Sequence, residues 1–226
     1  VFSATGIVSA TKFCGDGSCL SGLAGFSADA QGNLFASNTC SGCNFSGTDA
    51  CRNTLFGSCT GKSLTTGDDN IFLGSYAGQC VQTSSYHVMI GYKAGCRCSQ
   101  GVEGAVLIGQ EAGMCSDGNW NIMIGCRAGK SADGGGANIG LGAEALQSNH
   151  GNFNIAVGFR AGQIFCTNAN SNVVIGCTVC VPDATGSCQL AIGKGQDHWI
   201  TGNSDFNIGI GTQYPNAPVT SGNTQK

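Results

Sequence analysis

Apolar and polar positions follow one short block that recurs along the chain, as in Asn70–Gly78 (NIFLGSYAG) and Asn121–Gly129 (NIMIGCRAG). Ten copies begin between Asn53 and Asn207 at nearly regular intervals, and a degenerate copy aligns at Asn33. A period of about 17 residues is too short for two packed helices, but it fits one turn of a parallel β-roll or β-solenoid. Because stacked turns lie ~4.8 Å apart, the copies would build an all-β rod of roughly 50 Å.

The strand segment of each copy is apolar on both of its faces. Side chains alternate along a strand, so Ile71 and Leu73 share one face and Phe72 points to the other. Strands of this kind are typically buried on both faces. One face can fill the coil, and we predict that the other packs against further copies in an intertwined or axially packed homotrimer. The alternative is a single wider solenoid that covers this face with its own return segments.

Other columns of the repeat are nearly uniform. An alanine recurs three residues after the repeat glycine, as in Ala77 and Ala94, and we expect it to turn inward at a tight bend. An asparagine recurs before each strand, as in Asn53 and Asn70, and stacked asparagines can form a hydrogen-bonded ladder. His87 replaces one of these asparagines, and it is interpreted as a surface variant of the column.

Composition excludes several classes of protein. The 226 residues include 38 Gly but only 3 Pro, and 10% are charged. Collagen needs far more proline and a glycine at every third position, and disordered chains need more charge. Dense glycine also disfavours helix, and no apolar run has the length of a membrane-spanning helix. A net charge of −3 argues against nucleic acid as a partner, and we expect no membrane insertion.

Fifteen cysteines are unusual for a chain of this length. Cys80, Cys96, Cys98 and Cys115 are spaced by about one turn, and stacked Cα atoms would lie within the distance that a disulfide accepts. These four are therefore disulfide candidates, within a chain or equally between chains. Free thiols packed as small apolar residues are an alternative, and so is a zinc site at the two CxxC pairs that begin at Cys40 and Cys177.

Catalytic motifs are missing from the sequence. The phosphate-loop lookalikes GSCTGKS and GCRAGKS have three residues between their glycines, where a Walker loop has four. We predict that the protein is not an enzyme and uses no cofactor or metal. Trp120, Trp199 and Tyr86 fall in return or end segments and are candidates for stacking on host-surface sugars. The alternative is that they cap the apolar column.

Three segments resemble virion proteins. The segment Gly6–Gly25 (GIVSATKFCGDGSCLSGLAG) and the repeats after it resemble modules in tail-fibre and virion structural proteins of myovirus-type cyanophages. Phe206–Ala217 (FNIGIGTQYPNA) is similar to an NVGIGTxxP motif of phage fibres and other bacterial surface proteins. The repeat region also resembles the β-roll heads of trimeric autotransporter adhesins. This resemblance implies a homotrimeric fibre on a virion.

The sequence thus suggests three segments: a fibre-joining module at 1–32, a β-roll repeat region at 33–205 and a C-terminal fibre segment at 206–226. The function predicted is that of a virion tail fibre or related appendage, which provides mechanical reach and host attachment. Its partners would be itself, other fibre or baseplate proteins, and a host-surface glycan or protein. The alternative is a disulfide-stapled extracellular filament or adhesin subunit of a bacterial cell surface.

Overall fold

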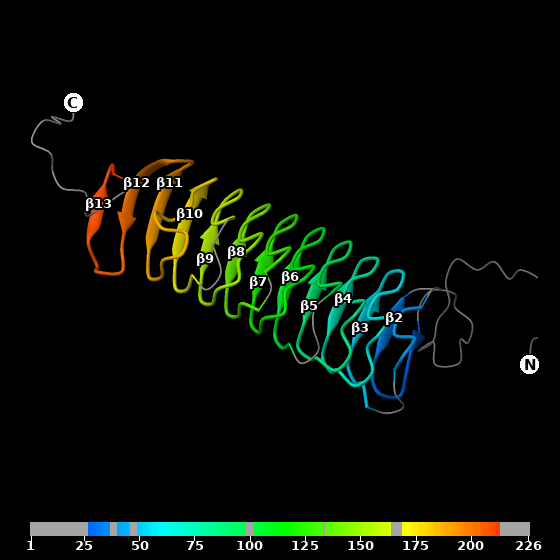
Figure 1. The fold of residues 1–226 in the computed structure, drawn as a ribbon. Coiled ribbons are helices and arrows are strands. Elements are labelled where there is room, and N and C mark those ends of the chain that lie inside the picture. Colours follow the sequence, from blue (N-terminus) through cyan, green and yellow to red (C-terminus); the bar gives the residue numbers. More distant parts are fainter. Residues whose placement is uncertain are drawn as a thin grey trace, which may run out of the picture.

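The protein is an all-β rod, described here from a computed structural model that covers residues 27–36, 40–45, 49–97, 102–132, 134–163 and 169–212. Thirteen strands form one sheet and follow each other in chain order, so that β1 and β13 lie at opposite ends of the rod (Figure 1). The described ranges hold no helix that is long and apolar enough to cross a bilayer. The strands are β1 (Ser27–Ala28), β2 (Leu34–Ala36), β3 (Thr54–Phe56), β4 (Ile71–Leu73), β5 (Val88–Ile90), β6 (Val106–Ile108), β7 (Ile122–Ile124), β8 (Ile139–Leu141), β9 (Ile155–Val157), β10 (Val173–Cys177), β11 (Leu190–Lys194), β12 (Asp197–Gly202) and β13 (Ile208–Ile210).

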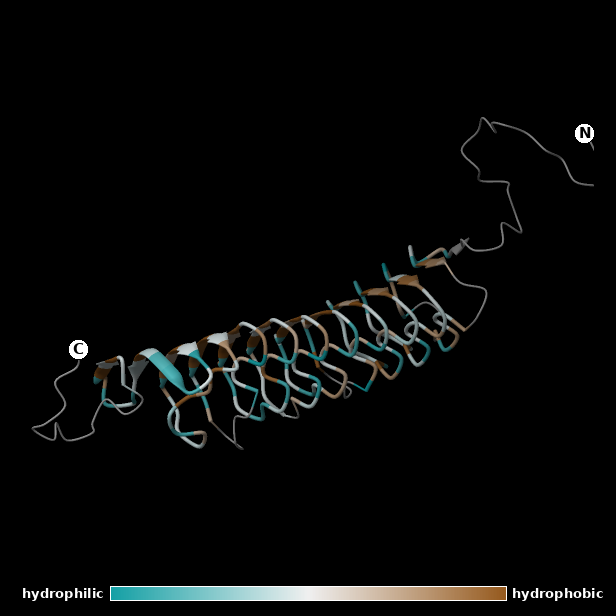
Figure 2. Cartoon of the chain, turned by 90° about the horizontal axis from the view of Figure 1, so that it is seen from above, coloured by the Kyte–Doolittle hydropathy of each residue, from teal (hydrophilic) through white to brown (hydrophobic). Residues whose placement is uncertain are grey.

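Strands β2 to β11 are the rungs of a parallel β-solenoid whose turns follow the predicted period. Each rung pairs with the next in register, so that Phe72 lies beside Met89 and Leu107 beside Met123. The strands run in one line along one side of the coil, and most of them are hydrophobic (Figure 2). The degenerate copy at Asn33 is a true turn, because β2 pairs in parallel with β3.

The last repeat copies behave differently from the rest. Strand β12 turns back after Gly195 and runs antiparallel to β11, and β13 runs antiparallel to β12. Asn207 therefore does not begin another turn of the coil, although its spacing is that of a repeat. Parallel stacking ends at Lys194, inside the segment 33–205 that the sequence assigned to the β-roll. The predicted joining module up to residue 26 and the segment from 213 onward lie outside the described residues.

The core is one side chain wide. The second residue of each strand from β3 to β11 points inward and is buried, and the alanine column is buried with it, as predicted. One turn shows how tightly this space is filled. In five turns a large residue at this second position packs on a glycine, as Met123 does on Gly129. In the turn of β8 the two sizes are exchanged. The second strand residue is Gly140, and Leu146, at the repeat position that Gly129 holds in the turn before, is fully buried.

The asparagine column forms the predicted ladder inside the coil. The Oδ1 atom of Asn121 accepts from the backbone N–H of Asn138 at 2.9 Å, and that of Asn138 accepts from the N–H of Asn154 at 2.9 Å. Each asparagine thus ties its own turn to the next one. The column is buried from Asn53 to Asn172, so the interpretation of His87 as a surface variant is wrong: its side chain has no exposed area. The reason is that the residue before each strand lies on the inner side of the bend.

The repeat glycine is required by its surroundings. Gly125 has a φ of 137°, in a region that only glycine adopts readily. A Cβ atom on Gly125 would also lie 2.5 Å from the carbonyl carbon of Gly142 in the next turn. The turns therefore approach each other through bare backbone at this corner, which keeps the strand face flat and continuous.

Candidate functional site

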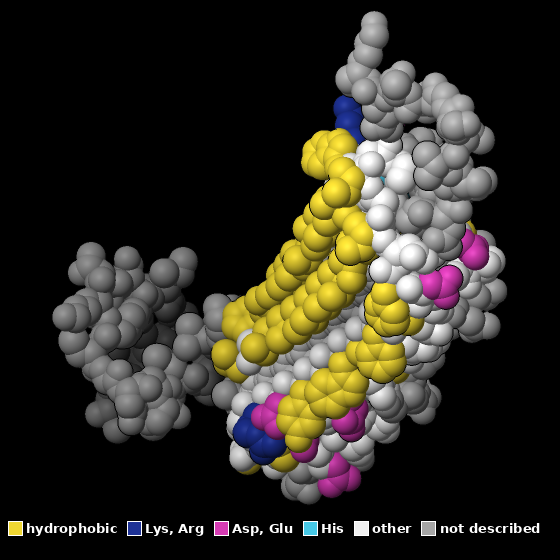
Figure 3. All heavy atoms as spheres, turned by 90° about the vertical axis from the view of Figure 1, so that its left-hand side faces the viewer, with side chains coloured by type: hydrophobic (Ala, Val, Ile, Leu, Met, Phe, Trp, Pro, Cys, Tyr) yellow, Lys and Arg dark blue, Asp and Glu magenta, His cyan; other side chains and the backbone are white. Residues whose placement is uncertain are grey.

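Two rows of aliphatic side chains form the outer face of the sheet. They come from the first and third positions of each rung, which point away from the core and are half-buried or exposed. Over eight successive strands every such residue is Ile, Leu or Val. Figure 3 shows the rows as two parallel apolar ridges along the rod. The aliphatic rows consist of Ile71, Val88, Val106, Ile122, Ile139, Ile155, Val173 and Leu190, and of Leu73, Ile90, Ile108, Ile124, Leu141, Val157, Ile175 and Ile192.

The rows continue onto the antiparallel end of the sheet and become more exposed there. Ile200 and Ile210 extend one row, and Ile208 lies at the same end. Ile208 is 70% exposed and Ile210 is 78% exposed, far more than the rungs that precede them. Because soluble proteins rarely leave a long apolar strip in water, this face is a candidate interaction surface.

A charged corner follows the aliphatic rows. Glu111 accepts from Lys130 at 2.8 Å and from Arg127 at 3.3 Å, and Glu144 accepts from Arg160 at 2.6 Å. Hydrogen bonding to Lys130 lowers the pKa of Glu111 from its ordinary value. These pairs join adjacent turns through side chains of both signs.

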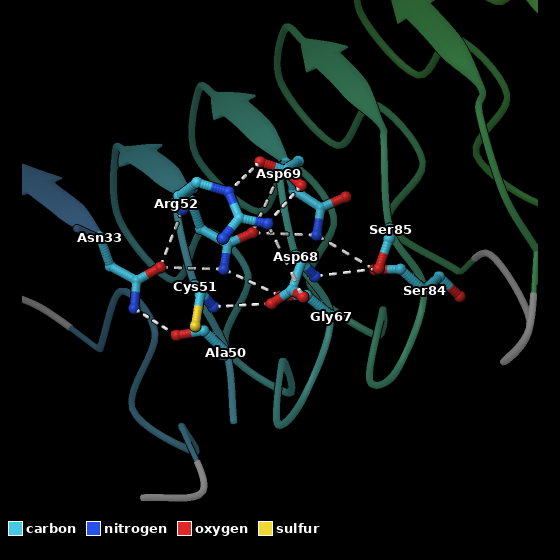
Figure 4. A network of polar contacts seen from close by, with 11 residues as sticks. Asn33, Ala50, Cys51, Arg52, Gly67, Asp68, Asp69, Ser84 and Ser85 are labelled. Carbon is cyan, nitrogen blue, oxygen red and sulfur yellow. Dashed lines mark hydrogen bonds and ion pairs between the residues drawn. The ribbon is translucent and has the colours of Figure 1, made fainter. Parts of the chain in front are cut away.

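A left-handed column lies on the opposite side of the rows, one residue before the asparagine ladder. Its members have φ between 55° and 64°, apart from the glycine of one turn. Their backbone N–H groups donate to the preceding turn, as Trp120 does to the Glu103 carbonyl at 2.9 Å. At the first turns the column carries Arg52 and Asp69, which pair at 2.6 Å (Figure 4). The left-handed column consists of Arg52, Asp69, Tyr86, Gly104, Trp120, Ala137, Phe153, Ser171 and Cys188.

Two of the three predicted recognition aromatics lie together in this column. Tyr86 and Trp120 are each 60% exposed, and Phe153, which the sequence analysis did not single out, is 64% exposed in the same column. Trp199 lies elsewhere, on β12 beside the aliphatic rows, and is 65% exposed. None of the four caps the core. The signal that could have found Phe153 is its position one residue before the asparagine of its own repeat copy.

A shallow hollow of about 450 Å³ opens between Trp120 and Phe153. Its floor is made of glycines and Ala137, and its polar groups are the side chains of Asp117, Asn119 and Asn152. Asn152 is held in place because its Oδ1 atom accepts from the Gly136 N–H at 2.8 Å. This hollow brings two aromatic rings and two amide side chains around one space.

The cysteine candidates lie on successive turns. Cys80, Cys96 and Cys115 come from three neighbouring turns and are thiols in the structure, and Cys98 lies outside the described residues. Cys96 is buried, and burial raises the pKa of its thiol. Cys80 and Cys115 on the neighbouring turns raise it further by smaller amounts. The proposed disulfides therefore stay predictions. A second stacked pair was missed by the sequence analysis: Cys40 and Cys59 hold the same left-handed corner position on adjacent turns.

Groups for metal binding do not converge in the described part of the chain, where no three His, Cys, Asp or Glu side chains are placed to hold an ion. The buried His198 instead makes contacts of 2.9 Å with the Cys180 carbonyl and 3.1 Å with the Gln196 carbonyl. Comparison of the chain with protein-family models, with curated proteins and with solved structures gave no match.

Proposed function

We propose that the protein is a structural fibre segment of a virus particle, a tail fibre or related appendage, built from three copies of the chain. The observation that carries this proposal is the pair of aliphatic rows. They run without interruption over eight strands, whereas the other long columns of the surface are charged or mixed. Parallel strands that are apolar on both faces are normally covered on both faces.

Three copies can cover these rows in a simple way. Each rung contributes only two outward side chains, so the apolar face is narrow and long. Three narrow faces can meet around one axis, with each rod contributing a side of the shared core. Apolar burial of this kind is worth about 25 cal/mol per Å² removed from water, so a strip repeated on every turn adds stability with length. A rod of this type provides reach and rigidity, which suits host attachment at a virion surface.

The measurement that tests the trimer is solution mass by light scattering, with and without reductant. We expect a mass three times that of the 22.8 kDa chain in both conditions. A stable monomer would overturn the trimer and favour a self-contained solenoid. A dimer would keep the interface but reject the threefold arrangement.

A matched pair of variants locates the interface. Ile108→Lys places a charge in the centre of the aliphatic rows, where a lone chain can extend it into water but a trimer must bury it. We expect this variant to be folded and monomeric. Gln110→Lys adds the same charge two residues later at an exposed position outside the rows, and it should remain trimeric. If Ile108→Lys leaves the mass unchanged, the rows are not the interface.

The alternative function, a disulfide-stapled extracellular filament or adhesin subunit, is favoured by the cysteines on neighbouring turns. It makes a different prediction for the same measurement, because the assembly should fall apart on reduction. The virion assignment has its own test. Mass spectrometry of purified particles should detect the chain beside other fibre or baseplate proteins, and its absence from them would reject the assignment.

A further inference from the structure

The left-handed column holds large aromatic residues that the fold gives no reason to place there. Its backbone has φ near 60°, which glycine, asparagine and aspartate tolerate better than bulky residues do. Trp120 and Phe153 adopt this conformation and still leave most of their side-chain surface in water. They contribute little to the core, so their benefit must come from contacts outside the chain.

The aromatic residues are also regularly spaced. Tyr86, Trp120 and Phe153 occupy every second turn, and the turns between them carry Gly104 and Ala137 in the same column. Two turns span roughly 9.6 Å along the rod. Gly104 leaves the space that the Trp120 ring occupies, and Ala137 leaves an open step between Trp120 and Phe153.

Trp120 forms a flat platform in this column. A Cβ atom on Gly104 would lie 2.7 Å from Cε3 of Trp120, so the indole ring lies directly over the glycine. One face of the ring therefore rests on the rod, which leaves the other face for a ligand. Aromatic faces are apolar and electron-rich, and they stack well on the C–H faces of sugar rings.

Hydrogen-bonding groups stand beside this platform in the hollow. The Oδ1 atom of Asn119 accepts from the Glu103 N–H at 3.0 Å, and no partner of its Nδ2 group occurs among the described residues. That nitrogen can donate to a hydroxyl group. Among the described residues that line the hollow only Asp117 is ionisable, and it accepts hydrogen bonds well but repels anions.

We propose that the hollow between Trp120 and Phe153 in the left-handed column is a binding site for a neutral glycan. A sugar ring would stack on Trp120, and Asn119 and Asp117 would bind its hydroxyl groups. This site deepens the proposed attachment function and rests on it for its biological setting. The chemistry excludes sialylated or sulfated glycans as the preferred ligands, because the hollow has an acidic group and no cation in the described lining.

Binding can be measured through Trp120 itself. The chain has only two tryptophans, so Trp199→Phe leaves Trp120 as a single fluorescent reporter. The variant of the 226-residue chain is titrated with neutral hexasaccharides of glucose, mannose, galactose and N-acetylglucosamine, and with sialylated and sulfated oligosaccharides. We expect a saturable fluorescence change with at least one neutral hexasaccharide and none with the anionic probes.

Variants then assign the site by calorimetry with the same probe. Losing one aromatic ring that stacks on a base costs ~1–3 kcal/mol, and by the same measure Trp120→Ala and Phe153→Ala should each weaken binding by about 5- to 150-fold. Tyr92→Ala is the control, because Tyr92 is also exposed but does not line the hollow, and its affinity should be unchanged. Equal affinity for Trp120→Ala, or no binding of any neutral probe, would overturn the site while the fibre proposal stands. A loss of the oligomer in Trp120→Ala would show that the column is a subunit interface and would also overturn it.

Discussion

Two adjacent columns of the same coil differ in almost every property. The asparagine column is buried and nearly uniform, and its asparagines bond to the next turn, as Asn121 does to Asn138. The left-handed column, one residue earlier, is exposed and carries charged, aromatic and small residues in turn. The backbone repeats equally well in both. The comparison shows that side-chain uniformity in this rod marks what the fold requires, and that variation marks surface that is free to serve another purpose.

The largest expected effect comes from breaking the uniform column. Asn138→Ala removes three hydrogen bonds: from its Nδ2 to the Asn121 Oδ1 at 3.2 Å and the Gly151 carbonyl at 2.9 Å, and to its Oδ1 from the Asn154 N–H. The Asn154 N–H loses its partner, which costs ~1–3 kcal/mol, and the two Nδ2 bonds are worth ~0.5–1.5 kcal/mol each. We therefore expect the free energy of unfolding to fall by about 4 kcal/mol in urea denaturation.

A matched control uses an asparagine outside the ladder. Asn119→Ala removes one exposed hydrogen bond, to the Glu103 N–H, and should cost less than ~1 kcal/mol. Similar losses for both variants would mean that the ladder adds nothing beyond ordinary surface hydrogen bonds.

The one histidine of the asparagine column predicts a pH effect of intermediate size. Burial lowers the pKa of His87 to about 4, and its Nε2 atom is buried without a partner in the described chain. Between pH ~6.5 and pH 4 the unfolded chain binds a proton that the folded chain excludes, so stability falls as the pH falls. At about 1.4 kcal/mol per pH unit, the loss should reach about 3 kcal/mol at pH 4.

His87→Asn isolates this contribution from the carboxylates, which also titrate at low pH. Asparagine is the residue of the other rungs and has no proton to gain, so the variant should lack the part of the acid sensitivity that His87 causes. Denaturation midpoints of both proteins at intervals from pH 7 to pH 4 give the difference directly. Parallel curves would show that His87 is not protonated on unfolding.

The sequence predicted the parts of the fold that repeat. The spacing of the copies gave the parallel coil, and the uniform Ala77 and Asn70 columns were correctly expected to turn inward or to form a ladder. Single replacements were harder to interpret, because their surroundings come from the neighbouring turns. His87 was placed on the surface, and the antiparallel return at β12 was missed because Asn207 keeps the repeat spacing.

The candidate site could be predicted only in part. Trp120 and Tyr86 stood out as aromatics in return segments, whereas Phe153 could have been found only from its position one residue before the repeat asparagine, which the other two share. The hollow depends on how the indole lies over Gly104 and on which amides are held beside it. These are contacts between different turns, and a single repeat copy does not contain them.

The smallest expected effect separates fold from function most sharply. Trp120 has a φ of 62°, a conformation that asparagine adopts at lower cost, so Trp120→Asn should raise the free energy of unfolding by about 1 kcal/mol. The same substitution at Trp199, which is equally exposed but lies in β12, should lower it slightly, because asparagine is a poor strand former. Urea denaturation of both variants measures the two signs. A destabilised Trp120→Asn would mean that the ring supports the fold through Gly104, whereas a more stable variant that binds no glycan would mean that the tryptophan is kept at this position for its ligand.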